Sequence, residues 1–305
     1  MKHSSLIVIS FICAVAFLFL KPFQDPSTSA SLSHSGIFSV GAMSEVKDYV
    51  ETFIEEDVAP SDILVALDID MTLTQPSQPE GQYPAILKHR DIYKGLSKEY
   101  RKEVFELASM YAVSEDSQSL VEKDTPSIIK DIQNKGVKTI AFTAAHAGRV
   151  GDHERFEVQR YDMLKDFGIN FENTFEKKKI VFTSMPLNRG EHPVFYHGIL
   201  CSNGENGSPT KGSVMGAFLR EMEFSPKVII LVDDKKKNLE SLEEGLKKDF
   251  PMALLIGLEY KEAMKGETAV SEAQFTAYWK GLAERAKNFI ASRADEPVAN
   301  KSSKL

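Results

Sequence analysis

Residues 64–70 read LVALDID, an apolar run that ends in two aspartates with one residue between them. Such a run suits a parallel strand, because its side chains meet apolar surface on both faces of a sheet. Unpaired carboxylates are costly to bury inside a strand of this kind. Open α/β sheets place their ligands at the carboxyl ends of the strands. The stretch therefore predicts a buried strand that delivers Asp68, Asp70 and Thr72 to that edge.

The rest of the chain alternates strand and helix signals, which indicates an α/β fold with a parallel central sheet. Further strand candidates are the apolar segments 137–143, 227–234 and 252–260. Segments 178–185 and 193–202 predict a hairpin. Helices are expected where apolar residues recur at helical spacing, at 44–56, 125–135, 153–167, 210–222, 238–248 and about 271–292.

A helical insertion interrupts this core. A loop rich in Pro and Gly follows the first strand, and apolar residues then recur at helical spacing up to about residue 120. We assign residues 76–123 to a small helical cap, and residues 44–75 and 124–292 to the core. Residues 31–43 are predicted to be a loose leader, and residues 293–305 a disordered tail.

The first thirty residues differ from the rest in composition. Lys2 precedes an apolar stretch from Leu6 to Leu20, and a segment rich in Pro, Ser and Thr then ends at Ala30. This order is typical of a secretory signal peptide over residues 1–30, so we expect an exported protein, periplasmic or secreted. The alternative is an uncleaved N-terminal anchor, although the apolar stretch is short for a bilayer span of about 20 residues. No other contact with a membrane is expected.

Charge and cysteine content exclude several kinds of partner and site. The formal charge of −7 argues against nucleic acid as a partner. Cleavage after residue 30 would leave Cys201 as the single cysteine, which excludes an intramolecular disulfide and a cysteine-ligated metal cluster. Cys201 lies in a strand-like segment and is expected to be a packed side chain rather than a nucleophile.

Polar residues stand where three of the predicted strands end. Asp68 and Asp70 follow the first strand, Thr143 ends the second, and Asp233 and Asp234 end a later one. The carboxyl ends of parallel strands share one edge, so we expect these side chains to converge. Several carboxylates in one crevice repel one another unless a cation binds, and hard oxygen ligands favour Mg²⁺.

Lys211 opens the helix that leads into the Asp233 strand, and it adds an ammonium group and free backbone donors to the same edge. A divalent ion, a lysine and a hydroxyl supply the positioning and charge neutralisation that phosphoryl transfer needs. One carboxylate can attack phosphorus while another, two residues on, gives or takes the proton. The pattern therefore predicts an enzyme that acts on a small phosphorylated substrate.

These motifs resemble, in order, motifs one to four of the haloacid dehalogenase-like (HAD) superfamily: LDIDMTLT, Thr143 after TIAF, Lys211, and VIILVDD with Asn238. Over about residues 62–260 the chain is similar to exported bacterial HAD-like acid phosphatases and to uncharacterised exported HAD-like proteins. The resemblance implies a Rossmann-like HAD core with a small helical cap. It also implies a Mg²⁺-dependent phosphatase, since a carboxylate two residues after the nucleophile is typical of phosphatases and phosphomutases rather than dehalogenases.

The resemblance further implies a role for each motif residue. Asp68 matches the nucleophile, which would form an aspartyl-phosphate intermediate with a phosphomonoester, and Asp70 matches the general acid/base. The metal would be held by Asp68, by the backbone carbonyl of Asp70 and by Asp233, with Asp234 as a supporting ligand or orienting group.

Thr143 and Lys211 match the groups that hold the phosphoryl oxygens. Two departures from the family's pattern concern substrate range. Motif two continues as TAAHAGR, which leaves open whether His146, Arg149 or neither contacts substrate, and Met71 stands where a glycine or small polar residue is frequent. The alternative function is an exported HAD-like binding protein with weak or no catalysis. A phosphotransferase or mutase would need a second sugar-phosphate site, for which the sequence gives no sign.

Overall fold

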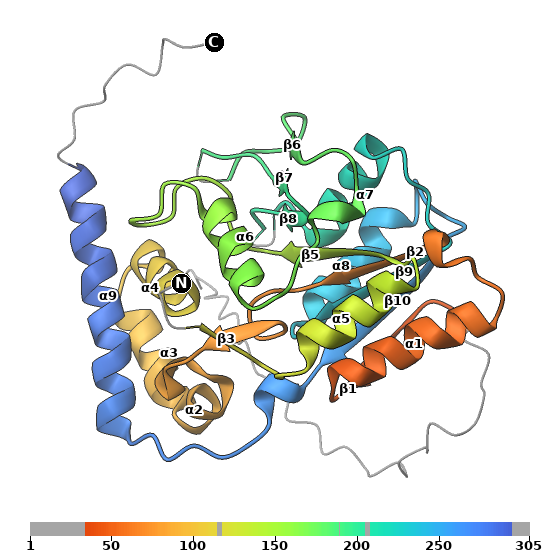
Figure 1. The fold of residues 1–305 in the computed structure, drawn as a ribbon. Helices are drawn as coiled ribbons and strands as arrows, with labels where there is room; N and C mark the ends of the chain where they lie inside the picture. Colours follow the sequence, from red (N-terminus) through yellow and green to blue (C-terminus); the bar gives the residue numbers. More distant parts are fainter. Residues whose placement is uncertain (1–33, 115–117, 189, 205–207, 295–305) are drawn as a thin grey trace, which may run out of the picture. The chain divides into compact units, whose positions relative to one another are not determined.

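The computed structural model describes residues 34–114, 118–188, 190–204 and 208–294. Within these residues, eight strands form one sheet in the order β1-β10-β9-β2-β5-β8-β7-β6 (Figure 1). The first six strands in this order, β1, β10, β9, β2, β5 and β8, run parallel to one another. Strands β7 and β6 extend the sheet in antiparallel pairing. The strands are β1 (Gly36–Val40), β2 (Ile63–Leu67), β5 (Lys138–Thr143), β6 (Lys179–Val181), β7 (Val194–Tyr196), β8 (Ile199–Cys201), β9 (Val228–Asp233) and β10 (Leu254–Tyr260).

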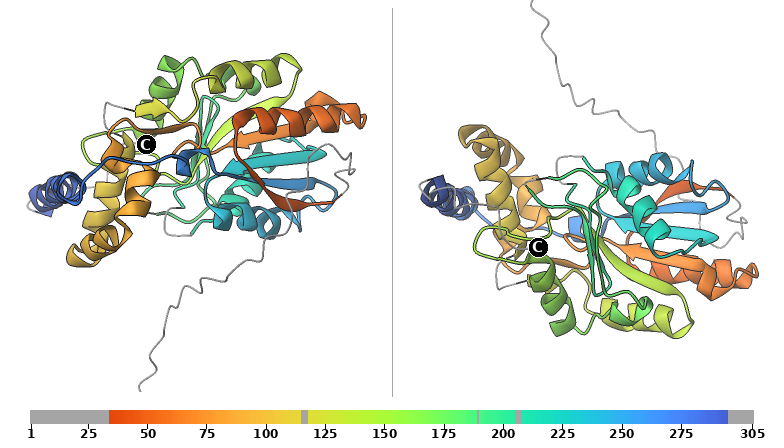
Figure 2. Two further views of the ribbon diagram at one scale, coloured as in Figure 1. Left: turned by 90° about the horizontal axis from the view of Figure 1, so that it is seen from below. Right: turned by 90° about the horizontal axis from the view of Figure 1, so that it is seen from above.

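Helices cover both faces of this sheet, and the predicted fold class, a Rossmann-like α/β core, is confirmed. Helices α1 (Met43–Glu55) and α5 (Thr125–Asn134) pack together on one face, and α7 (Lys211–Glu221) and α8 (Lys236–Leu246) pack together on the other (Figure 2). Helix α6 (Phe156–Asp166) contacts β7 and β8. The central strands β2 and β9 are buried along their whole length, as their unbroken apolar runs predict.

The pair α7 and α8 approaches more closely than side chains would allow. A Cβ on Gly212 would lie 1.7 Å from the carbonyl oxygen of Ser241, and a Cβ on Gly245 would lie 2.2 Å from the carbonyl carbon of Gly212. Glycine at both positions therefore lets the two backbones touch. This contact fixes the start of α7, where Lys211 stands, against α8.

The helical insertion lies between two short strands that pair with each other. Strands β3 (Thr74–Pro76) and β4 (Gln118–Leu120) form a separate antiparallel ribbon. Between them the chain forms α2 (Tyr83–Lys88), α3 (Arg90–Glu99) and α4 (Lys102–Ser114), inside the segment 76–123 assigned to the cap. Four single-turn 3₁₀ helices complete the described elements: Pro60–Asp62, Pro79–Gly81 (η2), Glu172–Thr174 and Glu262–Met264.

The C-terminal helix α9 (Glu272–Ala294) packs on the cap, so its assignment to the core is wrong. Its main contacts are with α4, and it also contacts α3 and η2. Phe275, Trp279 and Ala283 of α9 share one hydrophobic cluster with Phe105 and Tyr111 of α4. A periodic apolar face predicts a packed helix but does not identify the surface that it covers.

Two other assignments need correction. Residues 36–40, placed in the loose leader, form β1 and pair in parallel with β10, from Gly36 beside Ile256 to Val40 beside Tyr260. The single predicted hairpin is a three-stranded meander, in which β7 pairs with both β6 and β8, and β8 also joins β5. In both cases the pairing depends on partners that local sequence does not reveal.

Two predictions concern the ends of the chain, largely outside the residues that the structure describes. The predicted signal peptide, residues 1–30, lies outside the described residues, as does the predicted tail from residue 295 onward. Residues 293 and 294, also assigned to the tail, belong to α9. Among the described residues, no helix combines the length and apolar character needed to cross a bilayer.

Candidate active site

The polar ends of three adjacent strands meet at one edge of the sheet. Strand β2 lies between β9 and β5, and Asp68 follows β2 directly. Asp233 and Thr143 are the last residues of β9 and β5. The backbone N–H of Asp68 donates to the Val232 carbonyl at 2.8 Å, so the pairing of β2 with β9 continues up to the first aspartate. All three side chains are buried at this edge, so the predicted convergence holds for Asp68, Thr143 and Asp233.

A tight turn after β2 sets the direction of the Asp70 segment. The Ile69 carbonyl accepts from the backbone N–H of Leu73 at 3.0 Å and of Thr74 at 2.9 Å. Met71 inside this turn has φ +63°, in the left-handed region that favours glycine. A methionine in this conformation is strained, because its side chain is disfavoured where glycine is not.

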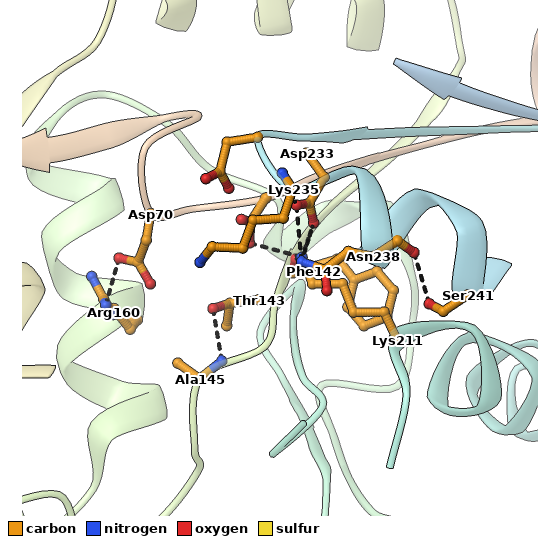
Figure 3. Close-up of polar contacts among 12 residues, drawn as sticks. Asp70, Phe142, Thr143, Ala145, Arg160, Lys211, Asp233, Lys235, Asn238 and Ser241 are labelled. Atoms are coloured by element: carbon orange, nitrogen blue, oxygen red, sulfur yellow. Dashed lines mark hydrogen bonds and ion pairs between the residues drawn. The ribbon is translucent and has the colours of Figure 1, made fainter. Parts of the chain in front are cut away.

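Lys211 connects the carboxylates of two strands. Its ammonium group donates to Asp68 Oδ1 at 2.8 Å, to Asp233 Oδ2 at 2.6 Å and to the Phe142 carbonyl at 2.5 Å (Figure 3). These three bonds use all three hydrogens of the ammonium group. The Lys211 side chain is almost completely buried. Lys211 is the first residue of α7, and the preceding Thr210 caps this helix by accepting from the Ser213 N–H.

Burial and charge shift the pKa values of this group in a consistent way. Burial raises the pKa of Asp68 to about 6, against the opposing effect of the Lys211 charge. Burial also raises the pKa of Asp233 and of Asp234. For Lys211 burial lowers the pKa, and the carboxylates of Asp233 and Asp68 outweigh that effect, so its pKa is raised. The site holds more negative than positive charge.

The two aspartates at the end of β9 differ in what their oxygens contact. Both carboxylate oxygens of Asp233 accept from Asn238 Nδ2, at 2.9 and 3.0 Å, and Oδ1 also accepts from the Lys235 N–H at 2.8 Å. Asp234 Oδ2 accepts from the Tyr83 hydroxyl, while its Oδ1 is buried with no hydrogen-bond partner among the described residues. Asp234 therefore has a carboxylate oxygen available to a ligand, whereas both oxygens of Asp233 already accept hydrogen bonds.

A divalent cation suits this set of oxygens. One carboxylate oxygen from each of Asp68, Asp233 and Asp234 lies within 4.8 Å of the others, and all three residues are buried. The Oδ1 of Asp234 has no hydrogen-bond partner among the described residues and is available to a cation, and carboxylate oxygens are the ligands that Mg²⁺ prefers. Asp68 and Asp234 would hold the ion directly, with Asp233 already bound by Lys211 and Asn238.

Asp70 lies apart from this carboxylate group, on the side facing the cap. Its Oδ1 is 2.7 Å from Arg160 Nη2, and the Arg160 side chain is completely buried (Figure 3). Arg160 Nη1 donates to the Val113 carbonyl at 2.8 Å, near the end of α4, and its guanidinium lies over the ring of Phe156. Asp70 is thus held by a cation that also contacts the cap.

Thr143 and the loop after it form the floor of the site. The Thr143 hydroxyl accepts from the Ala145 N–H at 3.0 Å, which leaves its hydrogen for another acceptor. His146 and Arg149, the alternative substrate contacts, do not line the cavity described next: His146 is buried, and Arg149 is exposed elsewhere. Cys201 is buried in β8, and burial raises the pKa of its thiol to about 12, which confirms a packing role rather than a nucleophilic one.

A cavity of about 410 Å³ joins the strand ends to the cap. Asp68, Asp70 and Thr143 lie at its floor together with Lys235, which Figure 3 shows extending into the space between Asp70 and Thr143. The Asp234 charge raises the pKa of Lys235, so its ammonium stays charged. The far wall comes from the cap and α9, with the side chains of Tyr83, Tyr93, Phe105, Met110 and Trp279.

Several residues at the site were not singled out from the sequence. Arg160 looks like any basic residue on an amphipathic helix, and Phe105 and Trp279 look like ordinary core positions. Their place at the cavity depends on how α6 and α9 pack. Lys235 directly follows Asp233 and Asp234 in a short lysine run, and that adjacency is the available sequence signal.

Comparison with known proteins gives one family and a set of relatives. A model described as "Protein of unknown function (DUF2608)" matches residues 39–289, from β1 to α9. An uncharacterized protein of Rickettsia bellii is 30% identical over 222 residues, 70% of this chain and 73% of its own. One from Rickettsia felis is 28% identical over 240 residues, 76% of this chain and 79% of its own. Among solved structures, the HAD domain of effector protein Lem4 from Legionella pneumophila (inactive mutant) aligns with a TM-score of 0.33 and 14% identity, over 76% of this chain and 98% of that one.

Proposed function

The chain belongs to the DUF2608 family, and we propose that it is a Mg²⁺-dependent phosphatase that hydrolyses a phosphomonoester through an aspartyl-phosphate on Asp68. The observation that carries this proposal is the buried group in which Lys211 joins Asp68 to Asp233 beside the unpartnered oxygen of Asp234. This group stands at the carboxyl edge of β2 and β9, and Asp68 is the member of it that lines the cavity. Buried charges at such an edge are typical of a reaction site.

The side chains divide the reaction between them. Asp68, largely ionised at neutral pH, attacks phosphorus, and the bond from phosphorus to the alcohol oxygen breaks. Asp70 supplies the proton for that oxygen and then takes one from the water that attacks the aspartyl-phosphate, which releases inorganic phosphate and restores Asp68. A bound Mg²⁺ would neutralise the carboxylates and the phosphoryl oxygens.

Two groups, Thr143 and Lys235, would hold the phosphoryl oxygens directly, and Lys211 would act on them at longer range. The Thr143 hydroxyl has a free hydrogen to donate, and Lys235 presents an ammonium group to the cavity. Lys211 has no free hydrogen in this arrangement, so it acts on the oxygens through charge and through its hold on Asp68. Lys235 is therefore a further candidate for the phosphate contact assigned to Lys211 from the sequence.

One observation favours the alternative, a binding protein with the same site and little turnover. Asp70 lines the cavity but its Oδ1 is paired with Arg160, a contact that favours the ionised carboxylate and opposes the protonation that Asp70 needs before it can give a proton to an alcohol oxygen. If that contact persists with substrate bound, the site would hold a phosphate without completing the reaction. Phosphate release distinguishes the two functions.

The test is release of inorganic phosphate from a panel of phosphomonoesters, with Mg²⁺ and with EDTA. We expect release only with Mg²⁺, a loss of at least about 1,000-fold in Asp68→Asn and of about 100-fold or more in Asp70→Asn. Asp62→Asn, at the opposite end of β2 in an exposed ion pair with Lys227, is the matched control and should stay within about twofold of the parent. Equal rates for Asp68→Asn and the parent protein would refute the mechanism. Mg²⁺ binding without any turnover would establish the binding function.

A further inference from the structure

The wall of the cavity opposite the carboxylates is built from aromatic rings that support one another. The Tyr93 ring lies 4.8 Å from the Trp279 ring and 5.1 Å from the Phe105 ring, both edge to face, and the last two rings stack at 5.9 Å. Three segments supply them, since Tyr93 is on α3, Phe105 on α4 and Trp279 on α9. The wall is therefore a rigid aromatic surface rather than a single exposed ring.

The polar atoms of these aromatic residues are already bonded within the protein. The Trp279 indole N–H donates to the Glu80 carbonyl at 3.1 Å, and the Tyr83 hydroxyl donates to Asp234. The Tyr93 hydroxyl lies 3.4 Å from Ser109 Oγ. A ligand with several hydroxyl groups, such as a sugar, would lose its hydrogen bonds to water at this wall and gain few in return.

Charge restricts the ligand further. Lys235 is the single basic residue among the described cavity-lining residues, and it stands at the carboxylate end. Glu106 is the charged residue on the cap side. A ligand with a second phosphate group would place that phosphate near Glu106. Lys102 is already paired with that carboxylate at 3.6 Å and does not line the cavity, which disfavours nucleoside diphosphates and sugar bisphosphates.

We propose that the substrate is a monophosphate ester whose leaving group is an aromatic, hydroxyl-poor alcohol. The phosphoryl group lies at Asp68, Thr143 and Lys235, and the ring of the leaving group packs against the Tyr93, Phe105 and Trp279 surface. Aromatic rings pack favourably edge to face or offset at these separations. A cavity of about 410 Å³ is in the range of roughly 300–1,000 Å³ that is typical of small-molecule sites. This inference rests on the proposed function for its catalytic readout.

The test compares two esters that both release a primary alcohol, benzyl phosphate and glycerol 1-phosphate, so that the leaving groups have similar intrinsic reactivity. We expect kcat/KM for benzyl phosphate to exceed that for glycerol 1-phosphate by about tenfold or more. In Trp279→Leu the benzyl phosphate value should fall by about tenfold while the glycerol 1-phosphate value changes by less than about threefold. Phe289→Leu, on the same helix and outside the cavity lining, is the matched control and should leave the ratio unchanged.

A binding measurement keeps the inference testable if no ester is hydrolysed or if Trp279→Leu does not fold. Trp279 is the single tryptophan of the chain, so its fluorescence reports on this wall alone. We expect benzylphosphonate, which cannot be hydrolysed, to change that fluorescence saturably and at concentrations at least about tenfold below those that methylphosphonate needs. Equal kcat/KM for the two esters would overturn the inference and leave the phosphatase proposal standing. Absence of turnover with every ester would overturn the phosphatase proposal, and the phosphonate titration would then decide the ligand class.

Discussion

Lys211 is the residue on which the charge balance of the site depends. Its ammonium group lies within 2.8 Å of both Asp68 and Asp233, and all three side chains are removed from water. A buried ion pair of this kind adds little net stability compared with apolar residues, but removal of one partner leaves an uncompensated buried charge. The lysine thus allows two carboxylates to be buried at a sheet edge.

Replacement of Lys211 by methionine should lower the free energy of unfolding by about 3–5 kcal/mol, because Asp68 and Asp233 then stay buried without their cation. Urea denaturation in EDTA measures the change. Lys227→Met, which removes an exposed ion pair with Asp62, serves as the control and should cost less than about 1 kcal/mol. Similar losses in both variants would show that the buried group depends little on Lys211.

For individual site residues, the sequence predicts those that directly follow a strand. It does not predict those that reach the site through the packing of helices. Asp68, Thr143 and Asp233 are recognisable because an apolar run precedes each of them along the chain. Arg160 carries no such mark, since its burial under Asp70 results from the position of α6 against α4. The difference between Asp233 and Asp234 is also not readable from the pair itself, because it depends on Asn238 and Tyr83.

Among the elements, the contact of α7 with α8 sets the position of Lys211. The two helices meet backbone to backbone at Gly212 and Gly245, and Gly212 N–H also donates to Ser241 Oγ at 3.2 Å. A side chain in this contact would separate the helices and move the first turn of α7. The position of Lys211 in the site therefore depends on Gly212 and Gly245, whose role is to let the two helices approach.

Gly245→Ala should destabilise the protein by about 1–3 kcal/mol, since the added methyl would overlap the Gly212 backbone. Gly281→Ala on α9 is a matched glycine-to-alanine change inside a helix, where nothing lies within 4 Å of the new methyl. That control should instead stabilise by about 0.5–1 kcal/mol through helix propensity. Thermal and urea unfolding of both variants measure the two effects, and a neutral Gly245→Ala would show that α8 adjusts freely.

Most elements of the core are predictable because their signals are local. The buried strands β2, β5, β9 and β10 have apolar runs, and the helices between them have a periodic apolar face. Strand β1 is as short as β2 but is only partly buried, in alternation, and it depends on the edge that β10 offers. The place of α9 could not be predicted either, because its apolar face suits a core and a cap equally.

For the whole molecule, Mg²⁺ should act as a ligand of the folded state. A ligand bound only by the native protein stabilises it by about 2.7 kcal/mol at one hundred times its dissociation constant, so the melting temperature should rise with Mg²⁺ concentration. Asp234→Asn should abolish most of that rise, because it removes the carboxylate with the free oxygen. Asp249→Asn, in an exposed ion pair with Arg220, is the control. An unchanged Mg²⁺ response in Asp234→Asn would place the ion elsewhere.

The parallel pairing of β1 with β10 has a consequence for how the chain reaches this structure. Gly36 lies beside Ile256, so partners in the sheet stand about 220 residues apart in the sequence. A ribosome releases β1 long before it has made β10, and the entropy of closing so long a loop slows the pairing further. We expect this border of the sheet to form last, in a folding step that waits for nearly complete synthesis. A chain exported by the secretory signal that we predict in residues 1–30 would gain time for transport from that delay.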